Sequence, residues 1–445
     1  MSLTPYAKRR ADVLRQMHAQ GGGVAIIPTA PEVMRNADAD YPYRHDSYFY
    51  YLTGFTEPEA TLVLVAGDQD QAILFCREKN EEREIWDGYR FGPDAAKQQF
   101  SFDAAYPVAS IDSELPRLMA NTPALFYALG SSATLDARIQ TWLNAVRTQA
   151  RSGVSAPGSA IDVRTILNEM RLVKDADEIA IMQRAADISA EAHARAMRTS
   201  RAGLREYHLE AELLHEFRRN GSQAPAYGSI VATGANACVL HYRAGDAELR
   251  DGDLVLIDAG CELDSYASDI TRTFPVNGKF SPAQKTLYEI VLDAQYAAIA
   301  ATRAGARFTD GHDAALRVLT QGMLDTGLLD KNKLGSVDDV IAGGQYRQFY
   351  MHRTGHWLGM DVHDVGDYRD PASAGQEKPW RTLTPGMVLT IEPGIYVRPA
   401  PGVPEQYWNI GIRIEDDALV TADGCAILTD KAPKTVAEIE AVMRG

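Results

Sequence analysis

The chain has 445 residues, which is too long for one small domain and suggests roughly two or three. Apolar residues make up 45% of the chain and charged residues 24%, values typical of a globular protein rather than a disordered or fibrous one. Asp and Glu (60) outnumber Lys and Arg (45), and the resulting net charge of −15 disfavours a nucleic-acid partner. No run of apolar residues is long enough to cross a membrane, so we also expect no membrane partner.

The first residues and the cysteines indicate the cellular compartment of the protein. The N-terminus carries Lys8, Arg9 and Arg10 where a signal peptide needs an apolar segment. The chain has four cysteines, which form no Cys-x-x-Cys pair and are too sparse for a disulfide scaffold. These observations predict a cytoplasmic protein with reduced thiols.

The first third of the chain has the pattern of an α/β domain. Tyr6–Gln20 predicts an amphipathic helix, and Arg147–Pro157, rich in Arg, Ser, Gly and Pro, predicts an exposed loop. Short apolar runs predict strands at 23–28, 61–66 and 72–76. A long helical pattern follows over Ile161–Ser200, and we place the domain boundary beside it, between residues 173 and 174. Residues 1–173 then form the α/β domain.

Residues 174–445 contain helices and strands in clusters, which indicates an α+β domain rather than a regular βαβ series. The pair Ser281-Pro282 predicts a helix start, because serine caps a helix and proline suits its first turn. Further predicted elements are strands over Leu254–Ala259, Ala267–Phe274, Val388–Ile391, Ile395–Val397 and Ile410–Val420, and helices over His312–Asp325 and Thr435–Met443.

Three common catalytic motifs are missing from the sequence. His215-Glu216 begins like the zinc-binding H-E-x-x-H motif, but Arg219 stands where the second histidine is needed. The sequence contains neither a G-x-S-x-G nucleophile turn nor a Walker A loop. Nucleophilic serine chemistry and nucleotide chemistry are therefore disfavoured.

Acidic residues at strand ends are the most informative feature of the sequence, because strands usually exclude them. Asp258 ends the apolar run 254–258, and Asp269 begins the next predicted strand, so a reversal of the chain between them brings both acids together. Glu392 ends a second apolar run before a Pro-Gly break. Arg413 and Glu415 are two positions apart, on one face of a predicted strand.

Three histidines, His352, His356 and His363, share one glycine-containing segment. Taken singly, such a histidine or a strand acid is more often a structural or surface residue. A cluster of Asp258, Asp269, Glu392 and Glu415 would carry four negative charges, whose burial is costly without compensation. Two divalent cations would neutralise it, and oxygen-rich ligation suits manganese, magnesium or cobalt, with zinc as an alternative. The sequence therefore predicts a two-metal site.

Five segments resemble the metal-site blocks of the Xaa-Pro aminopeptidases (aminopeptidase P), which belong to the creatinase/methionine aminopeptidase "pita-bread" group. They are Leu254–Gly260, Ser268–Phe274, His352–His363, Thr390–Gly394 and Gly411–Asp416. Residues 35–59 and 84–86 are similar to the amino-terminal domain of that family. The resemblance implies an α/β N-terminal domain followed by an α+β pita-bread catalytic domain.

The resemblance also implies roles for individual residues. The ligands of two manganese ions would be Asp258, Asp269, His356, Glu392 and Glu415, with Asp269 and Glu415 bridging both ions. Catalytic or substrate-binding roles are implied for His241, His352, His363, Tyr396 and Arg413, and a proton-shuttling role for Glu392. Asp38, Trp86 and Arg151 would help to close the substrate site, from the same chain or from a neighbour in a dimer or tetramer.

The chain departs from the family pattern in two places. Arg353 stands where the family often has glycine, directly after the first histidine of the histidine segment. Residues 370–379 look like an insertion before the fourth ligand, so the substrate-binding arginine of the family corresponds to either Arg369 or Arg381.

The activity that the resemblance implies is hydrolysis of the peptide bond before a proline in second position, by a hydroxide that bridges the two metals. The substrates would be peptides with an Xaa-Pro N-terminus. The alternative enzyme is a prolidase, which cleaves Xaa-Pro dipeptides. The alternative from another class is a non-catalytic pita-bread binding module, which the complete ligand set and the acidic charge disfavour.

Overall fold

The computed structural model describes residues 4–243, 245–373, 375 and 377–444. The contacts of the chain divide it into two compact units, Met1–Glu169 and Met170–Gly445. The boundary that we place at residue 173 stays a prediction. Within the described residues, no helix is long and apolar enough to span a membrane.

The N-terminal unit is built on one mixed sheet of six strands in the order β6-β5-β4-β1-β7-β8. These strands are β1 (Gly23–Pro28), β4 (Thr61–Ala66), β5 (Gln71–Cys76), β6 (Ala104–Pro107), β7 (Ala124–Tyr127) and β8 (Ser159–Asp162), and β2 (Met34–Asn36) and β3 (Ala39–Asp40) form a separate ribbon. The central strand β1 pairs antiparallel with β4 and parallel with β7. The strands predicted at 23–28, 61–66 and 72–76 are confirmed.

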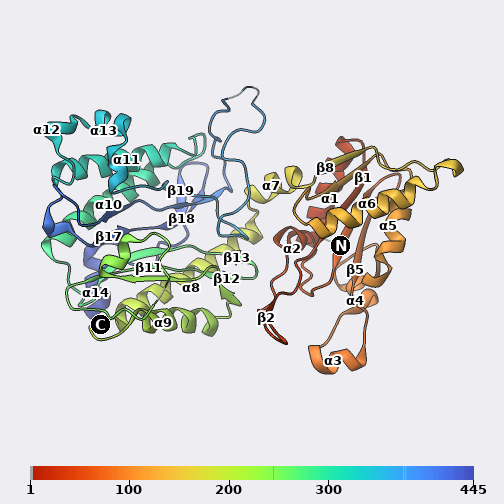
Figure 1. Cartoon of the computed structure of the whole chain (residues 1–445), viewed down its shortest axis with the longest axis horizontal. Helices are drawn as coiled ribbons and strands as arrows, with labels where there is room; N and C mark the ends of the chain where they lie inside the picture. Colours follow the sequence, from red (N-terminus) through yellow and green to blue (C-terminus); the bar gives the residue numbers. More distant parts are fainter. Residues whose placement is uncertain (1–3, 244, 374, 376, 445) are drawn as a thin grey trace. The chain divides into compact units, whose positions relative to one another are not determined.

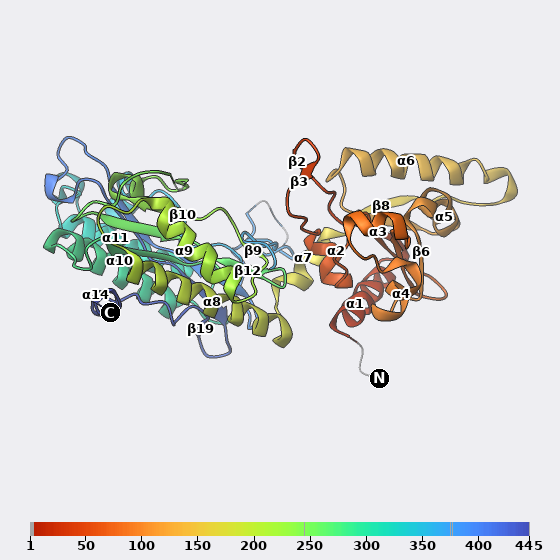
Figure 2. The same cartoon turned by 90° about the horizontal axis from the view of Figure 1, so that it is seen from below.

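Helices cover both faces of this sheet. They are α1 (Pro5–Ala19), α2 (Ser47–Thr53), α3 (Glu81–Asp87), α4 (Gly92–Gln99), α5 (Ile111–Met119) and α6 (Ala133–Arg147), with short 3-10 helices η1 (Val108–Ser110) and η2 (Ala150–Ser152). Figure 2 shows α6 on the opposite side of the sheet from α1 and α4. The predicted first helix is confirmed, and its start is fixed by Thr4, whose side chain accepts a hydrogen bond from the Ala7 amide.

The C-terminal unit places small sheets between two pairs of long helices, α8 with α9 and α10 with α11 (Figure 1). The helices of this unit are α8 (Ala176–Thr199), α9 (Glu206–Arg219), α10 (Pro282–Ala301), α11 (Asp310–Asp325), α12 (Lys331–Leu334), α13 (Val337–Gly343) and α14 (Val436–Arg444), with η3 (Gly234–Cys238), η4 (Gln345–Gln348) and η5 (Glu405–Tyr407). The division between the two units falls within α7 (Arg164–Leu172). The start of α10 at Ser281-Pro282 is confirmed as a capping box with Gln284.

The sheets of this unit have the orders β10-β11-β14, β13-β12-β9, β15-β18-β19 and β16-β17. Their strands are β9 (Ala224–Pro225), β10 (Ile230–Thr233), β11 (Leu254–Asp258), β12 (Cys261–Leu263), β13 (Tyr266–Ala267), β14 (Thr271–Pro275), β15 (Val388–Ile391), β16 (Gly394–Val397), β17 (Ile410–Arg413), β18 (Asp416–Val420) and β19 (Cys425–Ile427). This arrangement of α/β and α+β units agrees with the predicted fold class.

The predicted helix over Ile161–Ser200 is wrong, because the segment forms β8, α7 and α8. The interruption at residues 173–175 has two causes. The amide of Lys174 donates to the Gly386 carbonyl, which pulls the backbone out of the helix. The side chain of Asp175 then caps α8 in a capping box with Glu178.

Two predicted strands are also interrupted, and in both cases at an acid of the candidate site. The strand predicted over Ile410–Val420 breaks between β17 and β18, where the Glu415 amide donates to the Thr271 carbonyl. The strand predicted over Ala267–Phe274 breaks between β13 and β14, where the Asp269 amide donates to Asp417. Glu415 therefore lies outside β17, but its side chain and that of Arg413 line the same cavity, in line with the expectation that they share a face.

A buried ion pair between Arg272 and Asp416 holds the break between β17 and β18. Both side chains are fully buried, with Nη2 and Oδ1 2.7 Å apart. Arg272 also donates to the Glu415 carbonyl at 2.6 Å, and Asp416 accepts from Lys434 at 2.7 Å and from Gln295 at 3.0 Å. Burial alone raises the pKa of Asp416, but the charges of Arg272 and Lys434 outweigh it and hold the pKa well below its ordinary value.

We predict that Arg272→Met lowers the free energy of unfolding of the C-terminal unit by about 3–5 kcal/mol, because it leaves the Asp416 charge buried without its main partner. Chemical denaturation followed by circular dichroism measures the change. The matched control is Arg317→Met, which removes an arginine from an exposed pair with Asp338 and changes stability by about 1 kcal/mol at most. Equal stability of the two variants would contradict the prediction.

Candidate metal centre

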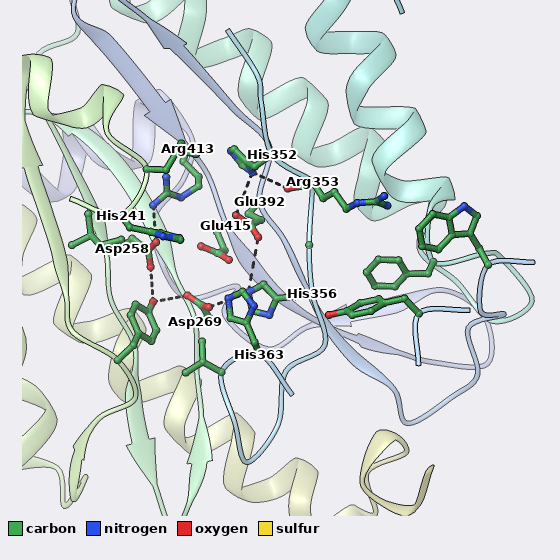
Figure 3. Close-up of a pocket in the computed structure, with 18 residues that line it drawn as sticks. His241, Asp258, Asp269, His352, Arg353, His356, His363, Glu392, Arg413 and Glu415 are labelled. Atoms are coloured by element: carbon green, nitrogen blue, oxygen red, sulfur yellow. Dashed lines mark hydrogen bonds and ion pairs between the residues drawn. The ribbon is translucent and has the colours of Figure 1, made fainter. Parts of the chain in front are cut away.

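A cavity of about 650 Å³ in the C-terminal unit holds the candidate site (Figure 3). All five residues expected to bind metal line it: Asp258, Asp269, His356, Glu392 and Glu415. Ligand atoms of Asp269, His356 and Glu415 lie within 4.8 Å of one another, and all three residues are buried. The sequence pattern therefore identifies residues that the fold brings together.

The acids reach the cavity from the ends and interruptions of strands. Asp258 is the last residue of β11, and its partner across the antiparallel pair is Thr271 on β14. Asp269 lies two residues before Thr271, so both carboxylates border the same space. The hydroxyl of Tyr227 lies 2.5 Å from a carboxylate oxygen of each. Glu415 joins them because Thr271 forms a bridge with it, and the Thr271 hydroxyl donates to its carboxylate at 2.6 Å.

His356 is oriented by its own backbone and by a close approach to β15. Its Nδ1 lies 3.0 Å from the Trp357 carbonyl, so Nδ1 carries the proton and Nε2 faces the acids. Nε2 lies 3.5 Å from Asp269 and 3.9 Å from Glu392. The preceding residue must be small, because a Cβ at Gly355 would lie 2.0 Å from the Thr390 carbonyl oxygen.

The crowded charges shift the acid–base behaviour of the site. Burial raises the pKa of Asp269, and burial with the charges of Asp269 and Glu392 raises the pKa of Glu415 well above its usual range. Burial also raises the pKa of Glu392 to about 7. For His356, burial acts in the opposite direction, but the hydrogen bond and charge of Asp269 outweigh it and raise the pKa to about 9. Without a cation, the site therefore retains protons near neutral pH.

Arg413 is fixed beside the acids as a structural cation. It is buried, and its Nη2 donates to Asp258 at 2.6 Å. Its other nitrogens donate to the Tyr396 hydroxyl at 3.0 Å and to Thr271 Oγ1 at 3.1 Å. Tyr396 is buried, and its hydroxyl lies 2.8 Å from Nε2 of His352, so Tyr396 links the arginine to that histidine. Arg413 compensates one charge of the cluster and leaves the remaining acids to other partners.

The predicted substrate-side histidines border the same cavity. His241, His352 and His363 all line it, and the ring of His363 stacks on that of His356 with centroids 3.8 Å apart. Burial lowers the pKa of His352 and of His363 to about 4, so both rings are neutral at physiological pH. A neutral ring has one donor and one acceptor nitrogen, and in His352 both already have partners, the Arg353 carbonyl and the Tyr396 hydroxyl.

The segment that carries His363 is anchored through the next residue. Asp364 is buried, and it accepts hydrogen bonds from Arg171 at 2.6 Å and from Lys174 at 2.9 Å. Its amide donates to the Trp357 carbonyl at 2.9 Å, which closes the loop between His356 and His363. The stacked histidine pair therefore rests on a fixed loop.

Other predicted site residues lie elsewhere in the fold. Asp38 is in the turn between β2 and β3, Arg151 is in η2, and Trp86 on α3 is 81% exposed, all within the N-terminal unit. Their contribution to the site stays a prediction. Of the two candidate arginines, Arg369 packs on Trp380 with its guanidinium carbon 3.6 Å from the ring centre, and the Arg381 amide donates to the Tyr368 carbonyl. The arginines among the described residues that line the cavity are instead Arg353 and Arg413.

The expected insertion over 370–379 is described only in part, since Ala374 and Gln376 lie outside the described residues.

Sequence reasoning missed Tyr227 and the aromatic wall formed by Phe308, Tyr368 and Trp380, which all line the cavity. Phe308 packs against Tyr368 with ring centres 4.7 Å apart. These residues come from segments with no regular pattern, and an isolated aromatic residue usually indicates core packing. The sequence therefore carried no signal that could have selected them.

Comparison with known proteins agrees with this geometry. Residues 180–422 match the metallopeptidase family M24, and residues 6–127 match the aminopeptidase P N-terminal domain. The Xaa-Pro aminopeptidase of Escherichia coli strain K12 is 45% identical over 445 residues, which are 100% of this chain and 98% of the relative. The Xaa-Pro aminopeptidase of Haemophilus influenzae is 45% identical over 98% of this chain and 96% of the relative.

Solved structures show the same likeness over the whole chain. The aminopeptidase PepP of Pseudomonas aeruginosa has a TM-score of 0.95 at 50% identity and covers 100% of this chain and 99% of its own. A zinc-substituted E. coli aminopeptidase P in complex with product has a TM-score of 0.94 at 44% identity, over 100% of this chain and 98% of its own. The chain belongs to metallopeptidase family M24, and within it to the group of the Xaa-Pro aminopeptidases.

Because the metal-free site holds protons, we predict that its affinity for metal ions depends on pH. The pKa of His356 is raised to about 9 and that of Glu392 to about 7, so the metal-free protein holds protons that a cation must displace. Affinity for Mn²⁺ should therefore rise with pH, by roughly tenfold or more between pH 7 and 8, where His356 alone releases one proton per ion. Calorimetric titration of chelated protein with MnCl₂ at both pH values measures this. An affinity that is equal at pH 7 and 8 would contradict the charge analysis.

Proposed function

We propose that this protein is an Xaa-Pro aminopeptidase, which releases the first residue of peptides that have proline in second position. The main support for the proposal is that five potential metal ligands, which come from separate segments, line one cavity. The chain also belongs to metallopeptidase family M24. The full-length similarity to curated Xaa-Pro aminopeptidases supports the same activity.

In this proposal Asp258, Asp269, His356, Glu392 and Glu415 hold two divalent ions. Four carboxylates carry four negative charges, of which Arg413 compensates one, so a single dication would leave the cluster negative and a second is needed to neutralise it. Carboxylate-rich ligation with one imidazole favours Mn²⁺, with Co²⁺ or Zn²⁺ as alternatives. The Nε2 atom of His356 is the free nitrogen that such an ion requires, because Nδ1 is engaged by the Trp357 carbonyl.

Bound divalent ions lower the pKa of water from about 15.7 towards neutrality and polarise a peptide carbonyl. The residues of the chain then stabilise the developing negative charge and transfer a proton. His363, held against His356, and His241 hydrogen-bond the carbonyl oxygen of the first residue as negative charge develops on it. Glu392 carries a proton to the nitrogen of the leaving proline, since its carboxylate borders the cavity.

A substrate site for proline requires a surface shaped for the proline ring. Proline offers no N–H for a hydrogen bond, and its φ angle is fixed near about −65°. His352 supplies this wall, and Tyr396 and Arg413 support it through the hydrogen bonds described above. Asp38, Trp86 and Arg151 of the N-terminal unit complete the substrate site in this proposal.

We further propose a cytoplasmic homo-oligomer, either a dimer or a tetramer. The cytoplasmic assignment is supported by four free cysteines, three of them buried, which suit a reducing compartment. The oligomer is proposed because the exposed Trp86 and the other residues of the N-terminal unit could then serve the site of a neighbouring subunit.

The substrate range tests the proposal against the prolidase and the binding module. We expect release of alanine from Ala-Pro-Ala, and much slower hydrolysis of the dipeptide Ala-Pro, in an assay that separates the products by chromatography. Preferred cleavage of the dipeptide would favour a prolidase, and no cleavage of either peptide by Mn²⁺-loaded protein would favour a binding module.

Replacing the central carboxylate tests the metal assignment. We predict that Asp269→Asn abolishes hydrolysis of Ala-Pro-Ala and reduces bound Mn²⁺, since Asp269 belongs to the compact ligand group. Metal analysis after dialysis and the peptide assay measure both effects. The matched control is Asp264→Asn at an exposed position of the same unit, which should retain both properties. Activity that survives Asp269→Asn would refute the role of Asp269.

A further inference from the structure

Arg353, in the wall of the metal cavity, has a different environment from that of the other arginine there, Arg413. The side chain of Arg353 is exposed and points away from the acids (Figure 3), and it packs against Trp380. Its guanidinium carbon lies 4.7 Å from the centre of the Trp380 ring, and no described carboxylate lies within ion-pair distance of it. Arg413, by contrast, is buried and paired with Asp258. The cavity therefore presents a free guanidinium at its rim.

A second hollow, of about 630 Å³, continues from this point. It shares His352, Arg353 and Trp380 with the metal cavity, so these residues border both spaces. Its lining carries more cations than anions, with Arg307, Arg347 and Arg353 against Asp310 and Asp313. The metal cavity has the opposite excess. A ligand that extends from the metal cavity into the second hollow therefore reaches a lining with one more arginine than carboxylates.

The surroundings of Arg353 suit a carboxylate in particular. Packing of the guanidinium against an indole restricts its motion and leaves the edge N–H groups free for a partner. A carboxylate matches that edge with two parallel hydrogen bonds.

We propose that Arg353 binds a carboxylate of the substrate that lies beyond its proline. This inference rests on the proposed function, in which the first residue lies at the acids and proline lies against His352. The peptide then continues past His352 to Arg353, which is the next residue along the same wall. The carboxylate is either the C-terminus of a short peptide or an acidic side chain. Arg353 is thus a residue that determines substrate specificity.

The side chain can be changed without loss of the contact that its backbone makes. Nδ1 of His352 lies 2.8 Å from the Arg353 carbonyl, which every substitution retains. Arg353→Met keeps the length and the apolar stem of the side chain and removes only the charge and the hydrogen-bond donors. Arg353→Gln is a second variant that keeps a donor without the charge, in case the first variant folds poorly.

The experiment compares kcat/KM for two matched substrate pairs. The first pair is Ala-Pro-Ala with a free C-terminus and the same peptide as its amide. The second pair is Ala-Pro-Glu-amide and Ala-Pro-Gln-amide. We expect the wild-type enzyme to prefer the carboxylate member of at least one pair, by roughly threefold to tenfold, and Arg353→Met and Arg353→Gln to reduce that ratio to about one. Arg303→Met, at an exposed arginine outside both hollows, should retain the wild-type ratio.

Each outcome has a defined meaning. A preference within the first pair alone assigns the terminal carboxylate, and a preference within the second pair alone assigns an acidic side chain. An equal ratio in wild type and in both Arg353 variants, or no preference in the wild type, overturns the inference while the aminopeptidase function stands. Failure of the wild type to cleave any of the four peptides overturns the proposed function, and the inference with it.

Discussion

The electrostatic repulsion among buried carboxylates is the constraint on which the rest of this structure depends. Asp269 and Glu415 are both buried beside His356, with ligand atoms within 4.8 Å of one another. Bringing such groups together is unfavourable unless opposite charge compensates them. Without a cation the protein retains protons, as the raised pKa values of Glu392 and Glu415 indicate. A pair of divalent ions would satisfy the same acids in their ionised form.

The fold fixes the positions of the acids but compensates only part of their negative charge. Arg272 binds Asp416 and the carbonyl of Glu415, so it holds the backbone of Glu415 but leaves its carboxylate facing the cavity. Arg413 compensates only Asp258 directly. Strands end or break at the acids, which turns their side chains towards one point. The ion pairs of Arg272 and Arg413 thus stabilise the backbone around the acids, and they offset part of the repulsion among the carboxylates.

The sequence was sufficient to predict elements set by local patterns, and insufficient where distant backbone groups decide the structure. The apolar run that ends at Asp258 and the Ser281-Pro282 helix start both follow from neighbouring residues. The breaks at Asp269 and Glu415 follow from hydrogen bonds to Asp417 and Thr271, which no local pattern reveals. Tyr227 was missed because its place in the site depends on hydrogen bonds to Asp258 and Asp269, which are distant from it in the sequence. The choice of the four cavity acids and His356 came from their positions in recognised motifs, and their placement around one cavity adds the geometry.

The central claim is that these five side chains form a centre for two metal ions. The most direct measurement is the number of Mn²⁺ ions that each chain retains after loading and extensive dialysis at pH 8, determined by elemental analysis against the protein concentration. The account predicts two ions per chain. Retention of none, or saturation at one in the presence of excess Mn²⁺, would contradict it.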